Sequence, residues 1–191
     1  MPLTRLLKRI SRPQKSRDCR FFNMKIELAQ LYQDIEYWIK NFVEIPHPAL
    51  GGWAPCPFAR RARLDRDFEV RVGQQPLADL AQLALTGLNN KSVIIIAYDS
   101  EIFAYDEFHS DLEHANTHHL LPNDLIVLED HPADKEIVNG ISMNQGTYAL
   151  AMVQSLSKLN TAAAQMSKKG FYHAWPEEYL QVLFHHRIDP R

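Results

Sequence analysis

The chain has 191 residues, of which 46% are hydrophobic and 23% are charged, and its formal net charge is −2. These values are typical of one globular domain and exclude a fibrous repeat or a fully disordered chain. Two cysteines, Cys19 and Cys56, are too few for a disulfide framework, so we expect a reducing, cytoplasmic setting. No apolar run approaches the roughly 20 residues that a membrane-spanning helix needs, and we expect no membrane partner.

Positive charge is concentrated at the N-terminus. Residues 1–23 contain seven arginines and lysines and one aspartate, with no apolar periodicity. We predict a disordered basic tail that serves as a targeting segment, as sequence upstream of a start at Met24, or as a phosphate-seeking arm. The remainder is acidic, which argues against nucleic-acid binding. Residues 24–191 are therefore predicted to form a single α/β domain with no nucleic-acid partner.

The first half of that domain has clear periodic patterns. Apolar residues recur at helical spacing over 25–43 and predict a helix of about five turns, which the following prolines end. Residues 68–72 alternate between apolar and charged, as expected of an edge or half-buried strand. A leucine-rich helix is predicted over 76–85, and the entirely apolar run within 92–98 predicts a strand that is covered on both faces.

The second half continues the alternation of helices and strands. We predict a helix over 105–121, a third strand over 125–128, one long helix over 147–168 and a final helix that Trp175-Pro176 opens. The polar loop over 133–146 is long enough to indicate a function. The pattern predicts a small, mostly parallel sheet of three or four strands, covered by helices, with a helical C-terminal region.

The most unusual residue choices surround Cys56, within residues 51–63. Pro57 suits the first turn of a helix, which would place Cys56 at the helix N-cap. Unpaired backbone N–H groups at that position favour the thiolate and lower the pKa of the cysteine. We therefore predict an activated cysteine. The alternative is a structural cysteine, because free cysteines are often buried as small apolar residues.

Three further residues near Cys56 are candidates for substrate binding. Arg60 and Arg63 lie one helical turn apart and add positive charge near the thiol, and Trp53 precedes it in the glycine-containing turn. We predict that these side chains bind a small anionic metabolite.

Two polar residues follow the predicted strands at their carboxyl ends, where ligands gather in open α/β sheets. Asp99 follows the second strand and His131 follows the third. If the turn with Cys56 lies over the same edge, the three residues could act as nucleophile, base and orienting carboxylate. They could equally bind a divalent metal such as zinc or iron. A histidine that merely caps the strand end is the alternative for His131.

A second candidate metal site lies on the helix predicted over 105–121. His114 and His118 are four residues apart, with Glu107 and Asp111 on the same face, and this spacing can bind zinc. A charged face that contacts only solvent is the alternative.

Other motifs are absent or carry no prediction. No glycine-rich phosphate loop follows a strand, which argues against nucleotide-dependent phosphoryl transfer and dinucleotide binding. The pair His185-His186 near the C-terminus is assigned no role.

The turn Cys56-Pro57-Phe58-Ala59-Arg60, together with His131-Pro132, resembles an uncharacterised bacterial family of unknown function over about residues 30–135. This resemblance implies a fold and no activity. The same turn is similar to the active-site turn of glutaredoxins and omega-class glutathione transferases, whose cysteine forms mixed disulfides. It also resembles a motif of small haem-dependent N-oxygenases, which implies that Cys56 is an axial haem ligand.

These patterns favour a small cytoplasmic enzyme, an oxidoreductase or a transferase, that acts on a small anionic metabolite. Its Cys56 would be a nucleophile or a ligand of haem, iron or zinc. The alternative is a non-catalytic binding or accessory protein in which Cys56 is structural and the apolar helices dock a partner.

Overall fold

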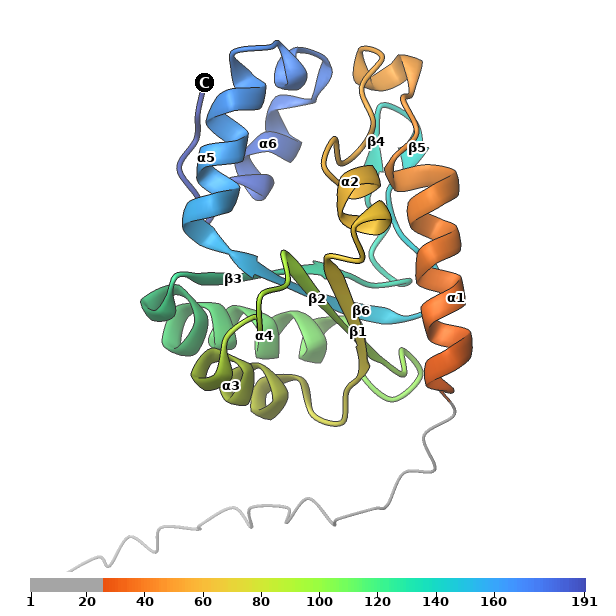
Figure 1. Ribbon diagram of the computed structural model, residues 1–191, viewed down its shortest axis with the longest axis vertical. Helices are drawn as coiled ribbons and strands as arrows, with labels where there is room; N and C mark the ends of the chain where they lie inside the picture. The colour runs from red at the N-terminus through yellow and green to blue at the C-terminus, as the bar shows by residue number, and fades with distance from the viewer. Residues whose placement is uncertain (1–25) are drawn as a thin grey trace, which may run out of the picture.

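The computed structural model describes residues 26–191, and Figure 1 shows a central sheet with helices on both faces. The predicted basic tail over residues 1–23 lies outside the described residues. Four strands form a mixed sheet in the order β1, β2, β6, β3. Their bounds are Phe68–Val72 for β1, Val93–Tyr98 for β2, Ala149–Ser155 for β6 and Leu125–Asp130 for β3. β1 and β2 are parallel, whereas β6 runs antiparallel to both β2 and β3.

Two helices cover one face of the sheet, which is the lower face in Figure 1. These are α3 (Pro76–Thr86) and α4 (Tyr105–Ala115), and α4 continues through a π-helical turn over Asn116–Leu120 and a 3-10 turn over Leu121–Asn123. Apolar residues of both helices, such as Leu80 and Phe108, pack against alternate residues of the strands. Pro76 starts α3 as the sequence predicts, because its fixed φ suits a first helical position.

The other face of the sheet has two separate covers. The helix α1 (Leu28–Trp38) and its π-helical extension Ile39–Val43 pack over β1 and β2. A C-terminal lobe with its own aromatic core consists of α5 (Leu156–Ser167), a 3-10 turn over Phe171–Ala174 and α6 (Glu177–Leu183). The short helix α2 (Ala59–Leu64), a 3-10 turn over Pro48–Leu50 and the hairpin β4 (Ile137–Val138) and β5 (Ile141–Ser142) complete this side.

The α/β class and the helical C-terminal region are confirmed, but the prediction of a mostly parallel sheet is wrong. Residues 147–168 were predicted as one helix, whereas residues 149–155 form β6 inside the sheet. All of residues 149–153 are apolar, a pattern that suits a strand covered on both faces as well as a buried helix. The helix begins only after Ser155, whose side chain accepts a hydrogen bond from the backbone N–H of Lys158.

The helices within residues 26–191 are too short or too polar to span a membrane.

Candidate functional site

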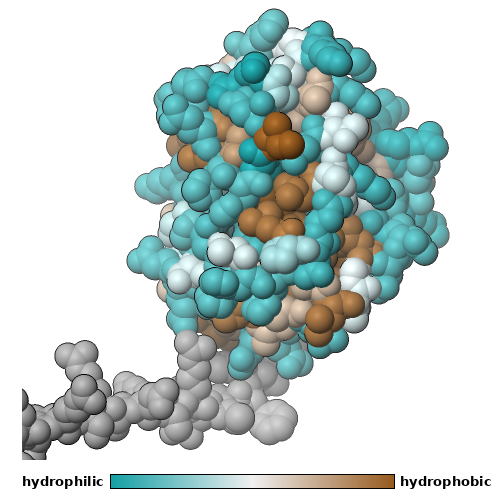
Figure 2. All heavy atoms as spheres, turned by 90° about the vertical axis from the view of Figure 1, so that its left-hand side faces the viewer, coloured by the Kyte–Doolittle hydropathy of each residue, from teal (hydrophilic) through white to brown (hydrophobic). Residues whose placement is uncertain are grey.

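A cavity of about 1050 Å³ lies between the sheet and the two helical covers on its upper face. Side chains of the sheet, including Ile95, Leu128 and Met152, line one side of it. The end of α1 and its extension, α5, α6 and the turn that carries Cys56 line the others, and residues of α4 reach it at the edge of the sheet. The face that carries α5 and the edge of the sheet shows hydrophobic side chains gathered in the middle of a mainly hydrophilic surface (Figure 2). A cavity of this size and apolar lining is typical of a small-molecule site.

Polar atoms without partners accumulate in the wall of this cavity. Four cavity-lining residues have a buried side-chain atom that makes no hydrogen bond with the described residues: Trp38 Nε1, Glu129 Oε2, Trp175 Nε1 and Arg187 Nε. Because buried polar groups in proteins are normally hydrogen-bonded, each of these atoms needs an explanation. The four residues that carry these atoms all line the same cavity.

Arg187 is a half-buried cation of this wall, which also contains the exposed Lys135. Its guanidinium carbon lies 4.9 Å from the centre of the Phe184 ring, and the guanidinium interacts with the hydroxyl of Tyr172. Burial lowers the pKa of Arg187 from its ordinary value, and Tyr172 partly opposes this shift. Within residues 26–191, no carboxylate forms an ion pair with Arg187. A half-buried positive charge without an acidic partner is unfavourable until an anion neutralises it.

Cys56 lies in the cavity wall, close enough to Tyr172 that a negative charge on its sulfur would raise the pKa of the tyrosine hydroxyl. The backbone N–H of Cys56 donates to Val43 O at 3.0 Å, which attaches this turn to the end of the α1 extension. The N–H groups of Phe58 and Ala59 point at the thiol and lower its pKa, but burial has the larger effect and raises the pKa of Cys56 above its ordinary value. The prediction of a lowered pKa is therefore wrong. α2 begins only at Ala59, and the apolar wall disfavours a thiolate.

The predicted substrate-binding residues lie outside the cavity lining. Arg63 forms a bidentate ion pair with Glu44, with N–O distances of 2.9 Å and 2.7 Å, and this pair lowers the pKa of Glu44. Arg60 is exposed. Trp53 packs edge-on against Phe171, with ring centres 5.8 Å apart, in the core of the C-terminal lobe. The arginine and lysine side chains of the cavity lining are Arg187 and Lys135, whereas the arginines of α2 lie outside it.

The structure does not bring His131 and Asp99 to Cys56, and neither residue lines the cavity. His131 is 2% exposed, its Nε2 lies 2.9 Å from Phe103 O, and its Nδ1 accepts a hydrogen bond from the N–H of Ala133 at 3.1 Å. Both ring nitrogens are therefore occupied, so that His131 acts as a cap beyond β3. Asp99 accepts a backbone N–H in the turn after β2.

The predicted metal site on α4 is only partly formed. The rings of His114 and His118 lie on an exposed surface with their centres 4.4 Å apart. Within residues 26–191, they belong to no group of three side chains whose ligand atoms could meet at one metal ion.

Such a group does form elsewhere, from Glu113, His185 and His186. Their ligand atoms lie within 4.8 Å of one another, and all three residues line the cavity. Sequence reasoning missed this group because the acid and the histidine pair are far apart in the chain. The pair itself was the only available signal.

Comparison of the chain with protein-family models, with curated proteins and with solved structures gives no match.

Proposed function

We propose that the protein binds a small organic acid whose apolar body occupies the cavity and whose carboxylate lies against Arg187. One observation carries this proposal: Trp38, Trp175 and Arg187 line one cavity, and each has a buried side-chain N–H group that lacks a partner among the described residues. Indole and guanidinium groups only donate hydrogen bonds. A complementary molecule must therefore offer acceptor atoms, and the charge of Arg187 favours an anion among them.

The other residues of the lining indicate that most of the ligand is apolar. The cavity wall includes a series of aromatic and aliphatic side chains, among them Phe42, Met152, Met166, Phe171 and Trp175. Burial of apolar ligand surface against these groups supplies binding free energy of about 25 cal/mol per Å². Because Arg187 is already half-buried in the free protein, pairing it with a carboxylate costs less desolvation on the protein side than pairing an exposed arginine would.

Catalysis by Cys56 is the second candidate function, either as a nucleophile or as a ligand of haem, iron or zinc. It is favoured by the N–H groups of Phe58 and Ala59 that point at the thiol, an arrangement that would stabilise a negative sulfur. Burial raises the pKa of Cys56, which favours the neutral thiol over the thiolate. A role as a wall contact of the binding site therefore agrees better with its surroundings than a role as a nucleophile.

Binding of decanoate, a simple acid with an apolar chain, tests the first proposal. We expect decanoate to quench the tryptophan fluorescence of the full-length protein. Arg187→Gln should weaken this binding about 10- to 100-fold, as expected for the loss of a charged hydrogen bond. Decanol, which lacks the charge, should bind the wild-type protein and Arg187→Gln equally.

The matched control is Arg60→Gln, because Arg60 is exposed and outside the cavity lining. This variant should bind decanoate as the wild-type protein does. Circular dichroism of both variants verifies their folding. Equal affinity of the wild-type protein for decanoate and decanol, or an unchanged affinity in Arg187→Gln, would overturn the proposal.

The reactivity of Cys56 separates the two candidate functions. In a Cys19→Ser background, alkylation by iodoacetamide between pH 6 and pH 10 is expected to follow an apparent pKa above the value of about 8.5 for a free thiol. The physical reason is that burial disfavours the thiolate. Mass spectrometry measures the alkylation rate of Cys56, and a cysteine-containing peptide gives the reference rate. Faster reaction than the peptide at pH 6 would contradict this expectation and favour the nucleophile.

A further inference from the structure

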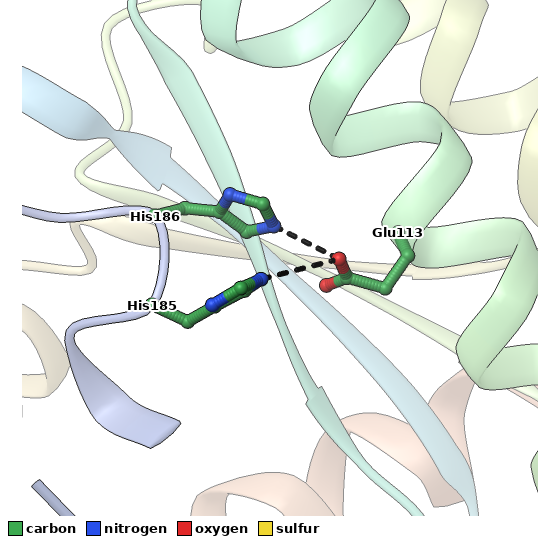
Figure 3. Close-up of side chains that lie close together, drawn as sticks. All are labelled: Glu113, His185 and His186. Carbon is green, nitrogen blue, oxygen red and sulfur yellow. Dashed lines mark hydrogen bonds and ion pairs between the residues drawn. The ribbon is translucent and has the colours of Figure 1, made fainter. Parts of the chain in front are cut away.

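Three side chains from two distant segments converge at the rim of the cavity. Glu113 comes from α4, and His185 and His186 come from the turn that follows α6 (Figure 3). The His186 Nε2 atom lies 2.9 Å from Glu113 Oε2, and the His185 Nε2 atom lies 4.0 Å from the same oxygen. Both imidazole rings therefore face one carboxylate.

The turn after α6 holds the two histidines in this arrangement. The backbone N–H of His185 bonds to Val182 O at 3.1 Å, and the N–H of Arg187 bonds to Phe184 O at 3.0 Å. These two bonds fix the backbone on either side of His186. The ring centres of His185 and His186 are 4.3 Å apart, so neighbouring residues present their rings side by side.

The separations of the ligand atoms suit one metal ion. All three ligand atoms lie within 4.8 Å of one another. Ligands at about 2.0–2.2 Å from a tetrahedral ion are separated by about 3.5 Å, so small side-chain rotations bring the three atoms to these positions. Two histidines and one carboxylate that leave coordination positions open form a donor set that proteins use for zinc and for iron.

A second observation beside this cluster also indicates a cation. Glu129 of β3 lines the same cavity, and its charge interacts with that of Glu113. Its Oε1 lies 2.8 Å from the Nδ1 of His109, whereas its Oε2 is buried and has no hydrogen-bond partner among the described residues. A buried carboxylate oxygen without a donor is costly unless positive charge lies nearby.

We infer that Glu113, His185 and His186 bind one divalent transition-metal ion, Zn²⁺ or Fe²⁺, at the rim of the cavity. Imidazole nitrogens favour these ions over Mg²⁺ and Ca²⁺, which prefer oxygen ligands. Three protein ligands leave at least one coordination position for a further oxygen atom. If the proposed acid occupies the cavity, its carboxylate can take that position. Only this coordination of the metal by the acid rests on the proposed function.

Titration of the untagged, full-length protein with Co²⁺ and Zn²⁺ after treatment with EDTA tests this inference. We expect Co²⁺ to produce visible absorption bands at one equivalent, and Zn²⁺ to displace it. His186→Ala and Glu113→Gln should each weaken Zn²⁺ binding at least 100-fold, because each removes one of three ligands.

The matched control is the double variant His114→Ala/His118→Ala, which removes a neighbouring histidine pair on the surface of the protein. This variant should bind Zn²⁺ as the wild-type protein does. The melting temperature gives a second readout, which does not require a measured dissociation constant. Added Zn²⁺ should raise it in the wild-type protein and not in His186→Ala. Less than one equivalent of bound metal, or loss of binding in the control variant, would overturn the inference. No acid is present in these titrations, so their outcome is independent of the decanoate experiment.

Discussion

Replacing Asn116 with alanine is expected to lower the free energy of unfolding by about 2–5 kcal/mol, because two buried backbone groups would lose their partners. Asn116 is 3% exposed and follows α4. Its Oδ1 accepts a hydrogen bond from the N–H of Val127 at 2.9 Å, and its Nδ2 donates to Val127 O at 3.1 Å. Since β3 is an edge strand, this amide takes the place of a neighbouring strand.

Urea denaturation followed by circular dichroism measures this loss. Asn123→Ala is the matched control, because Asn123 is exposed and its Nδ2 bonds only to the carbonyl oxygen of His119 at 2.7 Å. We expect this control to lose less than about 1 kcal/mol. Similar losses in the two variants would show that the amide of Asn116 does not stabilise the sheet edge. Val127 also lines the cavity, so Asn116→Ala should weaken decanoate binding as well.

Elements with an unambiguous local pattern were predicted from the sequence. The apolar run of β2 and the leucine-rich α3, with proline at its start, lie within one or two residues of their predicted positions. β6 was mistaken for the beginning of a helix because Leu150 and Val153 fit a helical period as well as a buried strand. This segment is a strand because it pairs with β2 and β3. The spacing of apolar residues within the segment does not indicate that pairing.

The position of Cys56 explains why the predicted catalytic group does not form. β2 and β3 both run antiparallel to β6, so their carboxyl ends, which Asp99 and His131 follow, lie at the same edge of the sheet. The cavity with Cys56 is instead lined by residues at the start of β2, such as Ser92 and Val93. Asp99 follows the opposite end of that strand and is absent from the lining.

The residues that now carry the proposals had little local signal. Arg187 is unusual because it is half-buried without an acidic partner among residues 26–191, and the sequence does not record burial. Likewise, the histidine pair becomes a candidate metal site only because α4 places Glu113 opposite it. Cys56 was identified from its flanking prolines and does line the cavity. The direction of its pKa shift depends on the burial of the thiol, which the sequence could not indicate.

Gly73→Ala is expected to destabilise the protein by at least about 3 kcal/mol, at the upper end of what overpacking of a core usually costs. A Cβ atom at this position would lie 2.1 Å from Cε1 and 2.5 Å from Cζ of Tyr98. The Tyr98 ring is fully buried, and it packs edge-on against Phe103 and Phe108 with ring centres 5.6 Å and 5.7 Å away. The two neighbouring rings therefore restrict the movement of the Tyr98 ring.

A double-mutant cycle with Tyr98→Leu tests this explanation by urea denaturation. Leucine lacks the ring atoms that the new Cβ would meet, so Gly73→Ala should cost much less in the Tyr98→Leu background than in the wild-type protein. Gly52→Ala is the control, because its Cβ would meet nothing within 4 Å and only its φ of +81° opposes the change. That variant should lose about 1–2 kcal/mol. Additive losses at Gly73 and Tyr98 would rule out the clash, and the destabilisation would then come from the backbone at the end of β1, where the Gly73 N–H bonds to Ala97 O.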